Sequence, residues 1–273
     1  MVAGGALLLS VLGFWLAVRP PRIAVPLAPR DFNLRVEELT IHAADGVTLA
    51  AWRVPRPEAP TVVLLHGYPA EKTDMLPLAA ALAPHFDVVL MDLRYFGRSG
   101  GAATTLGFRE RGDLRRLLDT LAARGATRVG VFGFSLGGAI GLLAAAEDDR
   151  IHALAAYAPF SDLRVLGRDV YAHVWLLKYP LVELMIMWGR LVFGADISRP
   201  APIEAARRLA IPVLLIASRE DEQIPFAHAE RLRDALARNP AADFEWEARG
   251  RHGHFGPDME RRLVEFFRRN LRP

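Results

Sequence analysis

The sequence of 273 residues predicts an α/β fold in which helices cover both faces of a mostly parallel, twisted sheet. Two observations predict this class. Short apolar runs recur along the chain, and they are as continuous as strands that are buried on both faces. Segments of helical length separate these runs, and strands that alternate with helices form right-handed crossovers in a mostly parallel sheet. The length fits one large domain better than two small ones.

The expected strands and helices follow one another along the chain. A hairpin comes first, because residues 34–42 and 47–54 flank the turn dipeptide Asp45-Gly46. The buried strands that follow are expected at residues 61–65, 87–91, 128–132, 153–157, 212–217 and 244–248. Helical patterns cover residues 114–123, 138–146 and 259–270. Catalytic groups of such sheets collect at the carboxyl ends of the strands, so functional motifs are expected directly after these runs.

Composition excludes several classes of function. The formal net charge is only +3, from 34 basic and 31 acidic residues, and the arginines show neither the clustering nor the aromatic interleaving of a nucleic-acid surface. The chain has no cysteine, which excludes disulfides, thiolate catalysis and cysteine metal sites. We therefore expect no nucleic-acid partner.

The N-terminal segment is uncharged and strongly apolar from Val2 to Val18. It lacks the basic start and the cleavage site of a signal peptide, and it lacks the polar face of an interfacial helix. The sequence therefore predicts an uncleaved single-pass membrane anchor over residues 1–19. Arginines follow the segment, and because basic residues tend to remain on the cytoplasmic side of a membrane, the folded domain is expected in the cytoplasm. A stiff linker rich in proline is expected over residues 20–31.

A serine stands in a glycine-rich turn directly after the expected strand that ends at Phe132. The run Gly133-Phe134-Ser135-Leu136-Gly137 has the G-x-S-x-G pattern and precedes an Ala-rich helix. A serine on such a tight turn has strained backbone angles, and the residues two positions to either side must lack Cβ atoms. The helix dipole that follows favours developing negative charge. Ser135 is therefore the candidate nucleophile.

A second glycine turn, His66-Gly67-Tyr68, follows the first buried strand. An acyl-transfer site needs backbone N–H donors for the oxyanion of its tetrahedral intermediate. We expect these donors to be the N–H groups of Tyr68 and Leu136. His66 precedes the turn, and its expected role is structural.

A nucleophilic serine needs an imidazole base and a carboxylate that orients the base. Three acids follow the strand at 212–217, and Asp221 is preferred over Glu220 and Glu222 because Ile224-Pro225 marks the turn into the next helix. Two histidines, His252 and His254, lie in a glycine-rich loop after the last strand, and either could be the base. A metal site at these histidines would lack a third ligand of matching spacing.

Together these motifs resemble the α/β-hydrolase superfamily, and especially its serine aminopeptidase-like and monoglyceride-lipase-like members. The resemblance covers residues 35–270 and includes the run from Asp92 to Ser99, which is similar to the D-x-R-x-x-G-x-S turn of the family. Residues 218–225 resemble G-x-x-D-x-x-V-P, with Ser218 in place of the usual glycine, and this implies Asp221 as the acid. Residues 251–255 resemble G-H-G-D-F, which implies His252 as the base. The implied domain spans residues 32–273.

This fold commonly carries a lid between its sixth and seventh strands, and here the lid is expected at about residues 163–200. The insert has an apolar run from Val174 to Phe193 that is rich in methionine and tryptophan, but Lys178, Glu183 and Arg190 interrupt this run, which argues against a second membrane span. Candidates for contact with substrate are Trp175, Leu177, Met185 and Trp188. An apolar lid beside a membrane anchor indicates a hydrophobic acyl substrate. A pair of helices that only pack on the sheet is the alternative.

The expected activity is serine hydrolysis of carboxylic esters with an apolar acyl group, as in a carboxylesterase or a lipase-like enzyme. A serine peptidase of the aminopeptidase-like type and an acyl thioesterase would use the same residues. A non-catalytic binding module is disfavoured by the intact set Ser135, Asp221 and His252, and a dehalogenase-like enzyme would prefer aspartate in place of the serine. Activated serine chemistry implies no cofactor and no metal. The expected partners are a small acyl ester or lipid and the membrane.

Overall fold

The computed structural model describes residues 2–247, 249–255 and 258–272. Met1, in the expected anchor, and Ala248, at the end of the expected last strand, lie outside the described residues. One sheet of eight strands has the order β1-β2-β4-β3-β5-β6-β7-β8. The strands are β1 (Glu37–His42), β2 (Thr48–Val54), β3 (Thr61–Leu65), β4 (Asp87–Met91), β5 (Val129–Phe134), β6 (Ile151–Tyr157), β7 (Val213–Ser218) and β8 (Ala242–Glu247).

The register of the sheet agrees with the sequence pattern. β1 and β2 form the expected antiparallel hairpin, and β2 also lies antiparallel to β4. All remaining pairs, from β4 through β3 to β8, are parallel. β3, β4 and β7 are buried along their whole length, which explains their continuous apolar runs. The prediction of a mostly parallel α/β sheet is confirmed.

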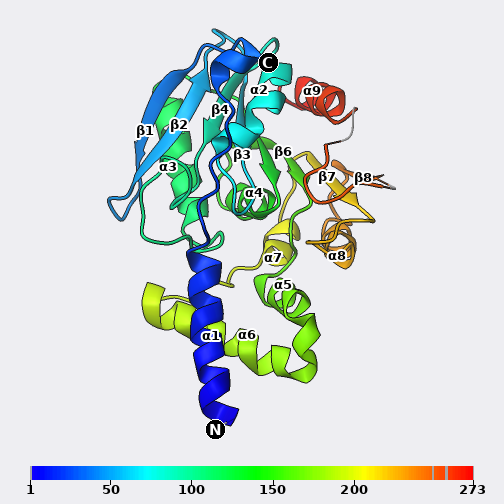
Figure 1. Cartoon of the computed structure of the whole chain (residues 1–273). Helices are drawn as coiled ribbons and strands as arrows, with labels where there is room; N and C mark the ends of the chain where they lie inside the picture. The colour runs from blue at the N-terminus through cyan, green and yellow to red at the C-terminus, as the bar shows by residue number, and fades with distance from the viewer. Residues whose placement is uncertain (1, 248, 256–257, 273) are drawn as a thin grey trace.

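Helices cover both faces of this sheet, each over its own apolar core (Figure 1). One face carries α2 (Leu76–Leu82) and α9 (Met259–Asn270), and Phe86 and Phe267 meet edge to face beneath them. The other face carries α3 (Glu110–Ala123), α4 (Leu136–Ala145), α7 (Pro202–Ala206) and α8 (Ala227–Ala235). Two short 3₁₀ helices, η1 (Pro29–Phe32) and η2 (Lys72–Met75), lie in the connections.

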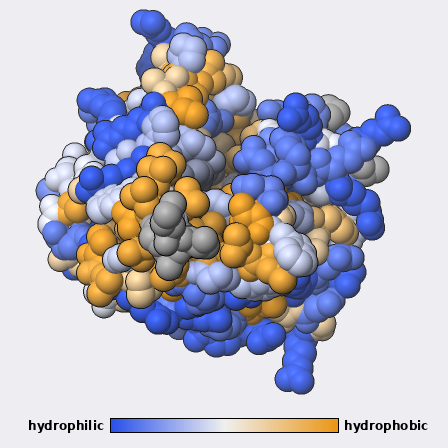
Figure 2. Space-filling model, turned by 60° about the horizontal axis from the view of Figure 1, so that its bottom comes forward, coloured by the Kyte–Doolittle hydropathy of each residue, from blue (hydrophilic) through white to orange (hydrophobic). Residues whose placement is uncertain are grey.

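A separate layer of helices lies beyond the carboxyl ends of the strands (Figure 1). It consists of α1 (Val2–Val18) and of three elements between β6 and β7, namely α5 (Leu163–Val170), η3 (Ala172–Leu177) and α6 (Lys178–Phe193). α1 crosses α6, and Phe14 and Val18 are buried there against Val182, Ile186 and Ile197. Figure 2 shows apolar side chains gathered on this face of the molecule, where Leu8, Leu12, Trp175, Leu176 and Leu191 are exposed.

The prediction of a membrane anchor over residues 1–19 is wrong. Among the described residues, none of the helices combines the length and the apolar character that crossing a membrane requires. α1 has 17 residues, and at about 1.5 Å per residue it is shorter than a hydrocarbon core of roughly 30 Å. Packing against α6 accounts for the apolar residues on one side of α1, such as Phe14 and Val18. The prediction that the folded domain lies in the cytoplasm depended on this anchor, so it is withdrawn as well.

Candidate active site

Ser135 lies at the sharp turn between β5 and α4. Its backbone has φ 52° and ψ −114°, a conformation that a residue with a side chain rarely adopts. The two flanking glycines are sterically required. A Cβ at Gly133 would lie 2.3 Å from the carbonyl oxygen of Gly137, and a Cβ at Gly137 would lie 2.5 Å from the carbonyl oxygen of Leu65. The turn therefore presents the serine hydroxyl at the carboxyl edge of the sheet, as the G-x-S-x-G pattern predicts.

Three side chains form a hydrogen-bonded chain across three loops. Ser135 Oγ lies 3.0 Å from His252 Nε2, and His252 Nδ1 lies 2.7 Å from Asp221 Oδ2. Asp221 comes from the turn after β7 and His252 from the loop after β8, so the carboxyl ends of three strands supply the set. The ring of Phe134 packs against the ring of His252, with 4.7 Å between the two ring centroids.

The surroundings of Asp221 keep its carboxyl group ionised. Burial by itself would raise the pKa of Asp221, but hydrogen bonds from His252 and from the N–H groups of Ile224 and Gln223 hold this pKa below its ordinary value. A carboxylate only accepts hydrogen bonds, so the proton between the two side chains belongs to Nδ1 of His252. In the neutral ring, Nε2 is then the unprotonated nitrogen, and it faces the hydroxyl of Ser135. This is the tautomer that a general base needs.

The two expected oxyanion donors lie beside Ser135. Tyr68 and Leu136 line the same cavity as the serine. The N–H of Leu136 belongs to the first turn of α4 and has no partner within its helix. Within the residues described, the N–H of Tyr68 donates no backbone hydrogen bond either. Both groups are thus available to an oxygen in the cavity.

His66 is fully buried and connects two turns of the site. Its Nε2 accepts the N–H of Leu93 at 3.0 Å, which leaves Nδ1 to donate to the carbonyl oxygen of Gly67 at 2.7 Å. Burial lowers the pKa of His66, so the ring remains neutral. His66 therefore connects the turn after β3 to the turn after β4, and it makes no hydrogen bond with Ser135.

The turn after β4 is organised around the buried carboxylate of Asp92. Asp92 accepts the N–H groups of Lys72 and Arg98, both at 2.8 Å, and forms a buried ion pair with the Lys72 ammonium. A Cβ at Gly97 would lie 2.3 Å from this carboxylate, so the position needs glycine. The D-x-R-x-x-G-x-S pattern thus has a structural role here, next to the turn that carries Tyr68.

The neighbouring candidates differ from the central set in their surroundings. Glu220 and His254 are exposed, and the carbonyl oxygen of His254 accepts the Tyr157 hydroxyl at 3.0 Å. Glu222 is also exposed, but it is more than a solvated neighbour. Its carboxylate accepts the N–H of His252 at 3.0 Å and pairs with Arg251 at 3.4 Å. Glu222 therefore holds the backbone of the histidine loop against the turn that carries Asp221.

A second serine, histidine and aspartate set lies nearby, and sequence reasoning missed it. His228 of α8 is fully buried, with Nδ1 accepting the N–H of Ser161 at 3.0 Å and Nε2 lying 3.1 Å from Asp169. Ser161 is also fully buried, and burial lowers the pKa of His228. Nδ1 of His228 also lies 2.8 Å from Ser161 Oγ, but a hydroxyl that is fully buried does not meet a substrate, so this set is not a second nucleophilic site. It joins α5 to α8 instead.

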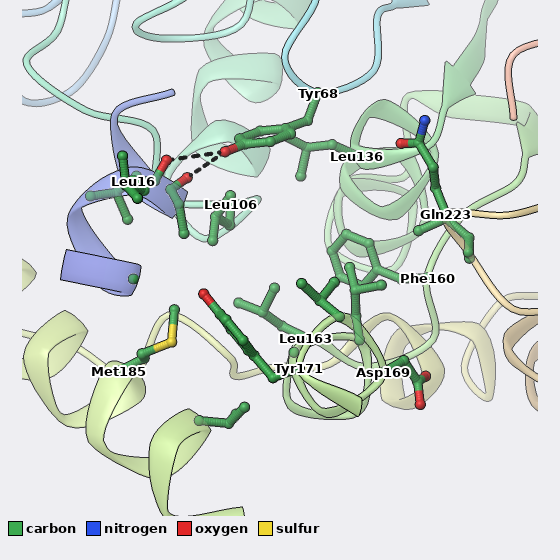
Figure 3. Close-up of a pocket in the computed structure, with 18 of the residues that line it drawn as sticks. Leu16, Tyr68, Leu106, Leu136, Phe160, Leu163, Asp169, Tyr171, Met185 and Gln223 are labelled. Atoms are coloured by element: carbon green, nitrogen blue, oxygen red, sulfur yellow. Dashed lines mark hydrogen bonds between the residues drawn. The ribbon is translucent and has the colours of Figure 1, made fainter. Parts of the chain in front are cut away.

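A cavity of about 670 Å³ opens beside Ser135 (Figure 3). This volume lies within the usual range for small-molecule sites. Apolar side chains line most of the cavity, among them Leu106, Phe160, Leu163 and Ile186. Of the four expected lid contacts, Met185 lines the cavity. Trp175 and Leu177 are exposed, and Trp188 donates a hydrogen bond to Ser10 of α1.

The cavity also has a wall that sequence reasoning did not anticipate. Five residues of α1 line it, namely Gly13, Phe14, Leu16, Ala17 and Val18. Their contacts join residues that lie more than a hundred positions apart in the sequence. The apolar run was visible in the sequence, but nothing in the local pattern distinguishes a helix that packs over a pocket from one that enters a bilayer.

Comparisons with known proteins agree with this fold. The model of the alpha/beta hydrolase fold family matches residues 60–181. The uncharacterized protein YqkD of Bacillus subtilis is 28% identical over 199 residues, which are 70% of this chain and 65% of YqkD. The matched region thus spans somewhat less than two thirds of that relative. The alpha/beta hydrolase domain-containing protein WAV2 of Arabidopsis thaliana is 26% identical over 238 residues, 83% of this chain and 75% of WAV2.

A solved structure is similar over nearly the whole chain. The esterase Pf2001 of Pyrococcus furiosus superposes with a TM-score of 0.77 and 25% sequence identity, and the match covers 94% of this chain and 99% of the esterase. The strand order, the serine turn and these likenesses agree, and they show that the chain has the α/β-hydrolase fold.

Proposed function

We propose that this protein is a serine carboxylesterase that cleaves esters with an apolar acyl group. The observation that carries the proposal is the hydrogen-bonded chain Ser135–His252–Asp221 beside a mostly apolar cavity. The similarity to an esterase from Pyrococcus furiosus supports the same class of reaction. The apolar cavity favours a hydrocarbon acyl chain over a charged or peptidic group, because burial of apolar surface against apolar walls contributes favourably to the free energy of binding.

The proposed reaction has two stages. Ser135 Oγ attacks the ester carbonyl carbon while His252 Nε2 takes the hydroxyl proton, and the N–H groups of Tyr68 and Leu136 stabilise the resulting oxyanion. The carbon–oxygen bond to the alcohol then breaks, His252 returns the proton to the leaving oxygen, and an acyl-enzyme remains. Water, deprotonated by the same nitrogen, then attacks the acyl carbon. The bond between this carbon and Ser135 Oγ breaks, His252 returns the proton to Oγ, and the carboxylic acid leaves. Asp221 stabilises the imidazolium at both stages.

A substrate panel tests this proposal. Purified full-length protein is assayed with p-nitrophenyl acetate, butyrate, octanoate, dodecanoate and palmitate, beside an acyl-CoA thioester and an aminoacyl p-nitroanilide. We expect the highest kcat/KM with esters longer than butyrate, because each buried methylene adds about 0.8 kcal/mol.

Three outcomes would contradict the proposal. Strict preference for acetate would exclude the apolar acyl group. Cleavage of the anilide without cleavage of any ester would favour the aminopeptidase-like alternative. Much faster hydrolysis of the thioester than of the matching ester would favour a thioesterase.

A further inference from the structure

Helix α1 is held rigidly over the candidate site. Phe14 and Val18 are buried against α6, and the indole N–H of Trp188 donates to Ser10 Oγ at 3.0 Å. At the other end of the helix, the N–H of Thr104 donates to the carbonyl oxygen of Val18 at 2.9 Å. These contacts fix the position of α1 relative to the cavity that it lines.

The last turn of α1 also contacts the turn that carries a proposed oxyanion donor. The hydroxyl of Tyr68 donates to the carbonyl oxygens of Ala17 at 3.1 Å and Leu16 at 3.3 Å (Figure 3). Burial raises the pKa of Tyr68 to about 12, so the phenol keeps its proton at neutral pH and acts as the donor. α1 is therefore connected to the site by a hydrogen bond as well as by packing.

At Gly13 the backbone of α1 lies close to the opposite wall of the cavity. A Cβ at this position would lie 2.9 Å from the hydroxyl oxygen of Tyr171 and 3.4 Å from the sulfur of Met185. All three residues line the cavity, which extends from Ser135 to this point. Figure 3 shows Tyr171 directing its hydroxyl toward α1, with Met185 beside it. The missing side chain therefore lets Tyr171 and Met185 lie close against α1.

We propose that Gly13 determines the length of acyl chain that the protein accepts. The inference rests on the proposed esterase function. An acyl chain bound to Ser135 extends along the apolar cavity toward α1, and its far end lies beside Tyr171 and Met185. A side chain at position 13 would push Tyr171 and Met185 away from α1 and into this space. Long acyl groups would then lose their binding site, while short ones, which end before it, would not.

The test is the variant Gly13→Val in the full chain. The measured quantity is kcat/KM for p-nitrophenyl dodecanoate divided by kcat/KM for the butyrate. We expect this ratio to fall by about 10- to 200-fold, the range that steric discrimination in apolar pockets covers. Gly5→Val is the matched control, because Gly5 is an exposed residue of the same helix and a Cβ there meets nothing within 4 Å. We expect the control to leave the ratio unchanged.

A double variant tests the steric cause. Tyr171→Ala removes the opposite wall, so Gly13→Val/Tyr171→Ala should regain most of the lost ratio. If Gly13→Val fails to fold, Gly13→Ala takes its place, with a smaller fall in the same direction. An unchanged ratio in a folded Gly13 variant, or an equal fall in Gly5→Val, would overturn the inference. Absence of ester hydrolysis in the unsubstituted protein would instead overturn the proposed function.

Discussion

Replacement of Ser135 by alanine is expected to lower kcat for ester hydrolysis by about a million-fold, the loss found when a nucleophilic serine of this type is removed. The substitution removes only the hydroxyl group, and among the described residues the only hydrogen bond of this group is with His252. The strained backbone is unaffected, because Ser135 N still donates to the carbonyl oxygen of Tyr157 at 2.8 Å. Steady-state hydrolysis of the best ester of the panel is the measurement.

The thermal unfolding midpoint of Ser135→Ala provides the control. Because neither the turn nor its packing changes, we expect a midpoint close to that of the unsubstituted protein. A folded Ser135→Ala variant with full esterase activity would mean that another residue is the nucleophile, and the proposed mechanism would be wrong.

Replacement of His252 by alanine is expected to be equally severe, because a serine without its base is not activated and the two residues act as one unit. His254→Ala is the matched comparison, since it removes a side chain of the same type two positions further along the chain. His254 is exposed, and only its carbonyl oxygen, which alanine retains, contacts Tyr157. We expect kcat to fall by about a million-fold in His252→Ala and to remain near the unsubstituted value in His254→Ala.

The pair of variants decides between the two histidines that the sequence left open. Asp221 retains its hydrogen bonds from Ile224 and Gln223 in His252→Ala, so its turn should remain folded. The reverse result, with loss of activity in His254→Ala and retention in His252→Ala, would assign the base to His254.

The central sheet and the serine turn were predictable because their sequence patterns are local. A strand buried on both faces has a continuous apolar run, and β3, β4 and β7 have this pattern. The requirement for glycine at positions 133 and 137 arises from contacts with residues of the same turn and of the neighbouring strand. Patterns of this kind lie within a few residues of the chain, so they can be recognised without coordinates.

The contacts of α1 could not be predicted in the same way. The apolar run of α1 has the composition of a membrane span, and its partners Val182 and Ile186 are far away in the sequence. The role of Glu222 was missed for a similar reason, because its carboxylate accepts the N–H of His252 from a different loop. His252 and His254 flank Gly253 symmetrically in the sequence, and it is the hydrogen bonds of His252 with Ser135 and Asp221 that distinguish them in the folded chain.

Covalent labelling tests the central claim most directly. The full-length protein is incubated with a fluorophosphonate, which reacts with activated serine hydroxyls, and the adduct is located by peptide mass spectrometry. We predict a single adduct on Ser135, and its absence in both Ser135→Ala and His252→Ala. An unlabelled Ser135 in a protein that hydrolyses esters, or an adduct on another serine that accounts for the loss of activity, would contradict the proposal that Ser135 is the nucleophile.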